Sequence, residues 1–146
     1  AAFMFTKVRL RMLYLYFYAW QYEYAVIGTT DKSEYTAGIY DPHGDGANDI
    51  TLLRHLYKTQ IRQLAEYMGL PEDIIRKPHT GDLYGNIPHE TTLGISYEQL
   101  DAVLYAMSSG HPGDQLAEIA SRGDLENVKR CVENARLARS LPLSLD

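Results

Sequence analysis

The side chains best suited to chemistry follow an apolar run in the first quarter of the sequence. Residues 24–28 (YAVIG) are apolar, and residues 29–34 (TTDKSE) carry hydroxyls, two carboxylates and a lysine. A turn between a buried strand and a helix N-terminus presents free backbone N–H groups, which suit a phosphate or an adenine ribose. Glu34 lies about one helical turn beyond Asp31 and could hold a hard cation such as Mg²⁺, which prefers carboxylate and phosphate oxygens. The alternative is an N-cap threonine beside a solvated glutamate, and spacing alone favours that alternative.

A second acidic stretch, residues 44–49 (GDGAND), alternates glycines with acids in the manner of a calcium-binding loop. It lacks the terminal bidentate glutamate of an EF-hand loop, and its flanking residues do not fit that motif. The stretch therefore predicts a tight surface turn.

The basic residues offer a place for phosphates. Lys58 and Arg62 lie one turn apart near the start of a helix predicted over residues 57–68, and Lys77 precedes Thr80 in a later loop. Lysines at loop mouths neutralise phosphates, although charges on an amphipathic helix more often form its solvated face. The five histidines are scattered without an HExxH pattern, which argues against a zinc site. Cys131 falls on the apolar side of its helix, which predicts a small buried side chain.

Composition limits the class of protein. The chain has 146 residues, of which 45% are apolar and 23% charged, and its net charge is −5. Since a domain usually has about 100–200 residues, this length suffices for one domain, and the composition excludes a disordered or fibrous chain. The acidic balance gives no basic field, so we expect neither nucleic-acid nor anionic-membrane binding. A single cysteine permits no internal disulfide and favours a reducing compartment, by default the cytoplasm.

Tyrosines are concentrated near the start of the chain. Five of the twelve lie within residues 14–24, and residues 12–20 (MLYLYFYAW) are entirely apolar or aromatic. This run is not predicted to be a signal peptide, because no small-residue cleavage site follows it. It is also too short for a membrane span, since it has about half the length needed to cross a bilayer. A helix that is apolar nearly all round belongs in a larger core or a subunit interface. We therefore expect that the 146 residues are not self-sufficient.

The elements that must position these residues follow from periodicity and capping patterns. An α/β fold is predicted, because residues 24–28 resemble a strand buried on both faces of a parallel sheet. Loops are predicted over residues 38–51 and 76–95, and a capping box at residues 96–99 begins a later helix. Helices are predicted over residues 7–23, 32–37, 57–68, 114–120 and 124–138. A short helical turn is predicted from residue 70, and a further helix after residue 96.

The order and spacing of several stretches resemble the C-terminal half of NAD synthetases, which are ATP pyrophosphatases with an adenine nucleotide α-hydrolase-like fold. The resemblance covers roughly residues 7–107. The matching stretches are VRLRM (8–12), AVIGTTDKSE (25–34), GDGANDI (44–50), LYKTQIRQLAEYMGLPEDIIRKP (56–78), TGDLYG (80–85) and LGISYEQLDAVL (93–104).

The resemblance implies a Rossmann-like fold with parallel strands flanked by helices and a mainly helical C-terminal portion, residues 111–146. It implies an amide-forming ligase in which ATP adenylates the carboxylate of deamido-NAD, pyrophosphate leaves, and ammonia attacks the acyl-adenylate to give NAD and AMP. Mg²⁺ would be the metal and a homodimer the assembly, with the tyrosine-rich helix near its interface.

The resemblance also assigns roles to individual residues. Thr29, Lys58 and Thr80 would contact ATP, and Glu34 would bind Mg²⁺. Arg9 and Asp49 would bind deamido-NAD. Asp82 and Glu90 fall in the family's substrate-covering loop, where the resemblance is weaker.

Three departures separate the chain from the family pattern. The pyrophosphate-binding SGGxDS loop is absent, so we expect either part of a longer enzyme or a degenerate homologue. Pro42 stands where the family has a lysine for the dinucleotide, and Leu137 and Ala138 stand where it has a His-Lys pair. These losses leave two alternatives open, a ligase that amidates a different acid and a non-catalytic subunit that retains the fold. The nitrogen source, ammonia or glutamine, also stays open.

Overall fold

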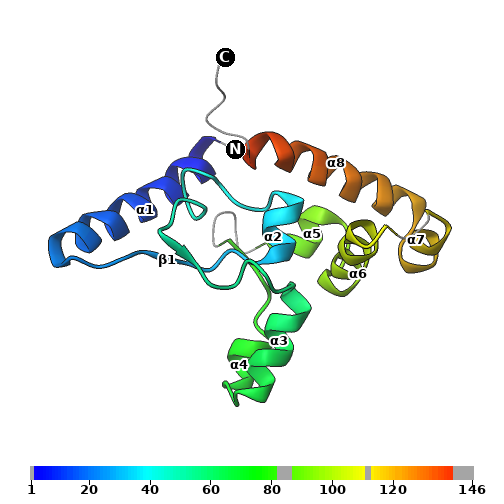
Figure 1. Ribbon diagram of the computed structural model, residues 1–146, viewed down its shortest axis with the longest axis horizontal. Helices are drawn as coiled ribbons and strands as arrows, with labels where there is room; N and C mark the ends of the chain where they lie inside the picture. Colours follow the sequence, from blue (N-terminus) through cyan, green and yellow to red (C-terminus); the bar gives the residue numbers. More distant parts are fainter. Residues whose placement is uncertain (1, 82–86, 111–112, 140–146) are drawn as a thin grey trace.

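The computed structural model describes residues 2–81, 87–110 and 113–139. Figure 1 shows α2, α5 and α6 near the middle, α1 and α8 along one edge, and α3 and α4 projecting on the opposite side. The elements, in chain order, are α1 (Ala2–Tyr22), β1 (Ile27–Gly28), α2 (Lys32–Ala37), β2 (Ile50–Thr51), α3 (Lys58–Tyr67), α4 (Glu72–Ile75), α5 (His89–Leu93), α6 (Tyr97–Ser108), α7 (Gly113–Ile119) and α8 (Arg122–Arg139).

The sheet consists of two short parallel strands, with Ile27 opposite Ile50 and Gly28 opposite Thr51. The parallel pairing agrees with the predicted α/β fold, but β2 lies at the end of a segment predicted to be a loop. Two residues are too few to show the alternation that identifies a strand. Gly28 lets the loop before β2 approach, because a Cβ on this residue would lie 2.2 Å from the Asn48 side chain.

The prediction of a strand buried on both faces over residues 24–28 is wrong in part. The strand proper begins at Ile27, whose side chain is 57% exposed, and Tyr24 is 72% exposed. Val26 packs inward against Met12 and Ala19 of α1, and Gly28 is also buried. In the described part of the chain, β1 has one neighbouring strand and α1 covers one side, which leaves its other side open.

The main hydrophobic core forms around α6. Tyr97, Leu100 and Val103 of this helix are completely buried. Leu125 and Val128 of α8 belong to the same cluster of buried side chains, as do residues of α2 and α7. The helices predicted at residues 114–120 and 124–138 are therefore present and pack on α6 and α2. Cys131 on α8 is half-buried, less enclosed than its position predicted.

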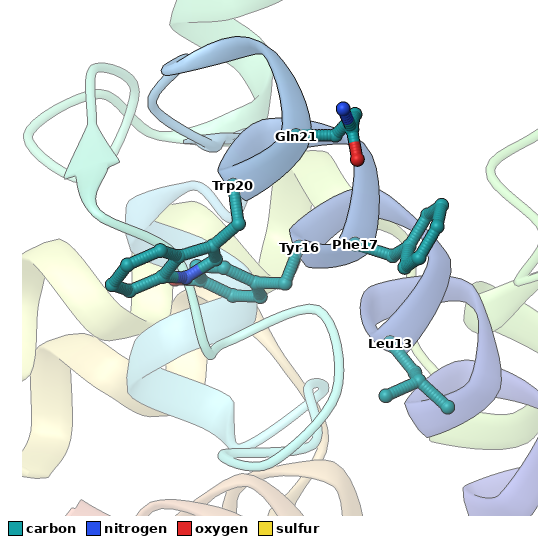
Figure 2. Close-up of a pocket in the computed structure, with 5 residues that line it drawn as sticks. All are labelled: Leu13, Tyr16, Phe17, Trp20 and Gln21. Atoms are coloured by element: carbon teal, nitrogen blue, oxygen red, sulfur yellow. The ribbon is translucent and has the colours of Figure 1, made fainter.

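Helix α1 is longer at its start than the predicted 7–23, and most of its apolar surface is uncovered. Met12 and Ala19 are buried, whereas Leu13, Phe17 and Trp20 are 64%, 62% and 83% exposed. Figure 2 shows the open groove that these three side chains form with Tyr16 and Gln21, all from α1. Among the described residues, no helix is long and apolar enough to cross a membrane.

The helix predicted at residues 57–68 is present as α3, and its apolar side chains Leu64 and Met68 are 41% and 67% exposed. Another prediction needs correction. The segment 76–95 predicted as a loop contains the five-residue helix α5, which begins after Pro88. So short a helix spans little more than one turn and shows no periodicity. Residues 82–86 of the segment lie outside the described residues.

A buried polar group joins three helices. The carboxylate of Asp101 on α6 accepts hydrogen bonds from the Ser33 hydroxyl of α2 and, at 2.8 Å, from the Thr59 backbone N–H of α3. Ser33 Oγ in turn accepts the Lys58 backbone N–H at 2.9 Å. Two of the free N–H groups in the first turn of α3 therefore have partners. This arrangement fixes the start of α3 against α2.

Replacing Asp101 by Ala should destabilise the full-length protein by roughly 2 kcal/mol, because it leaves two buried donors without acceptors. Glu98→Ala on the same helix is the matched control, since Glu98 is exposed and pairs with Arg62 at the surface. It should cost about 1 kcal/mol or less. Urea unfolding of both variants measures the difference, and equal losses would contradict the role given to Asp101.

Candidate functional site

Lys58 is the centre of the candidate site. It is the first residue of α3 and is only 8% exposed. Its ammonium Nζ lies 2.5 Å from Asp31 Oδ2 and 2.9 Å from Glu34 Oε1. Asp31 Oδ2 is buried and has no other polar partner in the described part of the chain, so Lys58 provides its charge partner. The interpretation of Lys58 as part of a solvated helix face is therefore wrong, and its charge is held inside the protein.

The two carboxylates are positioned by the start of α2. Asp31 is the N-cap, and its side chain accepts the Glu34 backbone N–H at 2.8 Å. Glu34 Oε2 accepts the Asp31 backbone N–H at 3.1 Å, which completes a capping box. Because only three residues separate β1 from α2, both carboxylates lie at the carboxyl end of the parallel strands, where ligands bind in open α/β sheets.

The electrostatics of this trio leave one negative charge in excess. Burial lowers the pKa of Lys58, but Glu34 and Asp31 more than compensate and hold it above the ordinary lysine value. Burial, with the nearby charge of Glu34, raises the pKa of Asp31 against the opposing effect of Lys58. Among the described residues, no group of three or more His, Cys, Asp or Glu side chains could hold a metal ion, but carboxylate oxygens are the ligands that a hard cation such as Mg²⁺ prefers. Glu34, with Asp31 beside it, is the residue suited to hold one.

Tyr97 and two histidines form the wall next to Lys58. Lys58 Nζ lies 5.4 Å from the centroid of the Tyr97 ring, and the Tyr97 hydroxyl is 3.0 Å from His89 Nδ1. The His79 ring meets the Tyr97 ring edge-on at 5.4 Å. Burial and the charge of Lys58 lower the pKa of both histidines, that of His79 to about 4. The site wall is therefore uncharged around neutral pH.

The remaining residues expected to contact ATP lie near this wall or strand end. Thr29 is exposed and directly follows β1. Thr80 follows His79 and forms an isolated antiparallel bridge with Pro88. Glu90, expected in a substrate-covering loop, instead lies in α5 and accepts the Tyr97 backbone N–H at 2.7 Å. Asp82 lies outside the described residues.

Arg9 and Asp49, expected to bind deamido-NAD, form a second group along α1. Arg9 Nε lies 2.7 Å from Asp41 Oδ2. Burial raises the pKa of Asp41, but the guanidinium overcomes this and holds that pKa below the ordinary value. Asp49 accepts the Tyr16 hydroxyl at 3.0 Å and the Val26 backbone N–H at 2.8 Å. Arg9 and Tyr16 are two helical turns apart, so one face of α1 serves both residues.

Three residues that hold the site together, Asp31, Asp101 and Ser33, were not among the site residues predicted from the sequence. Asp31 was visible as an N-cap candidate, and the D-x-x-E spacing to Glu34 is a capping-box pattern that predicts their pairing. Asp101 stands four residues after Tyr97 and three before Leu104, so an acid on an apolar helix face was a signal for a buried polar contact. Its partner Ser33 carried no comparable signal.

The lowered pKa of His79 predicts a loss of stability in mild acid. Between pH 6.5, the ordinary value, and about 4, the unfolded chain binds a proton at His79 that the folded protein excludes, so stability should fall as pH falls through this window. His79→Gln should flatten the fall in urea midpoint between pH 7 and pH 4.5. His43→Gln, at an exposed turn, is the control. An unchanged slope in His79→Gln would refute the assignment.

The chain is similar to known proteins in sequence. Residues 4–142 match the family model described as NAD synthase. The NH(3)-dependent NAD(+) synthetase of Coprothermobacter proteolyticus is 41% identical over 144 residues, which cover 99% of this chain and 49% of that protein. The Thermotoga maritima enzyme of the same name is 38% identical, over 99% of this chain and 50% of that protein. The chain spans about half the length of the curated relatives it matches.

Solved structures agree with this result. The NMN synthetase of Francisella tularensis superposes with a TM-score of 0.83 at 31% identity, over 98% of this chain and 56% of that chain. An NH3-dependent NAD synthetase from Campylobacter jejuni gives a TM-score of 0.76 at 27% identity, over 97% and 54%. Both the sequence match and the fold lead to one conclusion. The chain belongs to the NAD synthase family.

Proposed function

We propose that this chain forms the C-terminal part of an ammonia-dependent NAD synthetase, a carbon–nitrogen ligase that makes NAD from deamido-NAD, ATP and ammonia. The observation that carries the proposal is the position of Lys58, buried against Asp31 and Glu34 at the carboxyl end of the parallel strands. A buried ammonium beside a carboxylate suits a nucleoside triphosphate and its divalent cation. The choice of deamido-NAD as the acid and of amide formation as the reaction rests on the family match.

The residues of this chain have distinct tasks in that reaction. Lys58 binds phosphate oxygens of ATP, while Thr29 and Thr80 supply hydroxyls to the same nucleotide. Glu34 holds Mg²⁺, which when bound neutralises charge on the phosphates. The deamido-NAD carboxylate then bonds to the α-phosphorus as pyrophosphate leaves, and ammonia bonds to the acyl carbon as AMP leaves. The uncharged wall of His79 and Tyr97 limits solvent near the anhydride.

The assembly and setting belong to the same proposal. Tyrosine-rich α1 presents a long exposed apolar face, which suits a subunit interface or contact with the rest of a longer synthetase domain. We propose a homodimer in the cytoplasm. The pyrophosphate of the leaving group would be held outside this chain, which has no SGGxDS sequence.

A second candidate is a ligase of the same mechanism that amidates a smaller acid. Pro42 and Leu137 replace charged family residues on the dinucleotide side, and Arg9 is already paired with Asp41. The high TM-score with an NMN synthetase also favours this candidate. In that case the acid would be the mononucleotide counterpart of NMN, and the nitrogen source would still be ammonia.

Turnover with the two acids distinguishes the candidates. The full-length protein, given ATP, Mg²⁺, an ammonium salt and one acid, should release AMP and pyrophosphate in equal amounts with the amide. Higher kcat/KM with deamido-NAD supports the first candidate, and higher kcat/KM with nicotinate mononucleotide supports the second. Failure to release AMP with either acid would contradict both and favour a non-catalytic subunit.

Replacing Glu34 by Gln should lower kcat by roughly 100-fold, because the variant loses the charge that holds Mg²⁺. Glutamine keeps an acceptor for the Asp31 backbone N–H, so the start of α2 should remain intact. Glu66→Gln, on the exposed side of α3, is the matched control and should retain full activity. Saturation of the rate with Mg²⁺ measures the effect, and unchanged kcat and Mg²⁺ dependence in Glu34→Gln would rule out the assigned role.

A further inference from the structure

Two arginines and two tyrosines form a cluster outside the Lys58 site. The guanidinium carbon of Arg54, in the connection between β2 and α3, lies 4.4 Å from the ring centroid of Tyr35 on α2. Arg139, the last residue of α8, lies 5.2 Å from the same ring. Tyr40 stacks on Tyr35 with their centroids 5.4 Å apart. These four residues, from three separate parts of the chain, are called here the arginine–tyrosine cluster.

The cluster has positive charge that the described residues do not balance. Within residues 2–81, 87–110 and 113–139, neither Arg54 nor Arg139 forms an ion pair with a carboxylate. Among these described residues, buried Arg54 Nε has no hydrogen-bond partner, and Arg139 Nη1 donates a long bond of 3.4 Å to the Tyr35 carbonyl. The neighbouring acid Asp45 is engaged elsewhere, since its carboxylate accepts the Asp41 backbone N–H at 2.9 Å.

Half-buried arginines without acid partners are unusual, because a desolvated guanidinium is costly unless it is paired. Stacking on tyrosine offsets part of the desolvation cost, but it gives the guanidinium N–H groups no hydrogen-bond acceptor. Two guanidinium groups with free donors match the oxygens of a phosphate, which accepts several charge-assisted hydrogen bonds. An oxyanion is therefore the ligand chemistry that completes the cluster.

The cluster also lies beside both departures from the family's dinucleotide residues. Tyr40 precedes Pro42 by two residues, and Arg139 directly follows Leu137 and Ala138. The positions that lost a lysine and a His-Lys pair are thus adjacent to two arginines whose donors are not used by carboxylates. Asp41, which holds Arg9, lies between Tyr40 and Pro42. The cluster and Arg9 are connected through this short segment.

We propose that the arginine–tyrosine cluster binds a phosphate group of the acid substrate, with Arg54 and Arg139 taking the place of the missing family cations. The inference rests on the proposed function, because it assigns the anion to the substrate of that ligase. The phosphate belongs either to a mononucleotide acid or to the pyrophosphate bridge of deamido-NAD. Arg54 and Arg139 are substrate-binding residues in this account and take no part in bond formation.

The test compares Arg54→Gln and Arg139→Gln in the full-length protein with Arg122→Gln, an exposed arginine of α8 paired with Glu126. Inorganic phosphate is titrated with the ATP site filled by a non-hydrolysable ATP analogue and Mg²⁺, so that phosphate cannot report on Lys58. Each cluster variant should weaken phosphate binding by roughly tenfold, and Arg122→Gln should leave it unchanged. The KM for the acid should rise by a similar factor while the KM for ATP stays the same.

The two sources of the phosphate give different results. A KM rise confined to nicotinate mononucleotide assigns the cluster to a monoester, and a rise confined to deamido-NAD assigns it to the pyrophosphate. Arg54→Lys keeps the charge but loses the planar fork, so it should fall between the wild type and Arg54→Gln. If Arg54→Gln does not fold, Arg54→Lys and Arg139→Gln are the variants used for the test.

The proposal would be overturned if folded cluster variants bound inorganic phosphate as the wild type does and changed no KM for either acid. A cluster that only braces α8 against α2 would give this result, with a lower melting temperature as its sole effect. Weaker phosphate binding in the variants, without turnover of any acid by the wild type, would keep the anion site and reject the ligase.

Discussion

The ion pairs of Lys58 with Asp31 and Glu34 are the interaction on which the rest of the site depends. A lysine this deeply buried is stable only where opposite charges offset its lost hydration, and removing one member of such a group leaves an uncompensated charge. The capping box of α2 holds both carboxylates, and the Ser33–Asp101 hydrogen bond fixes the first turn of α3, from which Lys58 extends. Stability and site geometry therefore share the same residues.

The second constraint is the open apolar surface of the molecule. The core around α6 is closed, yet α1, the outer side of β1 and the stripe of α3 leave large apolar side chains such as Trp20 and Met68 in contact with solvent. In Figure 1, α1 lies toward one end of the molecule, and α3 projects from its middle on the side opposite to α1 and α8. The curated relatives that this chain matches are about twice its length.

Much of the fold could be predicted from the sequence, because its longer helices carry both periodicity and caps. The helix at residues 32–37 agrees with the structure at both ends, and the capping box at Ser96 marks the start of α6. Elements such as β2 and α5 were missed because each spans little more than one period of the pattern that would identify it. The burial of residues 24–28 was overestimated because the pattern reflects a sheet with more neighbours than β1 has here.

The candidate site was harder to predict than the fold. Glu34 and Lys58 were selected from the sequence, and the structure brings them within 2.9 Å, but their spacing along the chain does not reveal the contact. The site requires the N-termini of α2 and α3 to meet, which only long-range packing through Asp101 determines. Arg54 lies in a connection with no recognisable pattern, and Arg139 lies one residue beyond the helix predicted at residues 124–138. Their shared contact with Tyr35 depends on where α8 ends.

The central claim is that Lys58 exchanges its carboxylate contacts for phosphate oxygens of ATP while Glu34 holds the metal. A crystal structure of the full-length protein with Mg²⁺ and a non-hydrolysable ATP analogue tests this claim most directly. The account predicts Lys58 Nζ within hydrogen-bonding distance of a phosphate oxygen and a Glu34 oxygen among the Mg²⁺ ligands. A structure in which Lys58 keeps both carboxylates and the nucleotide phosphates lie out of its reach would contradict it.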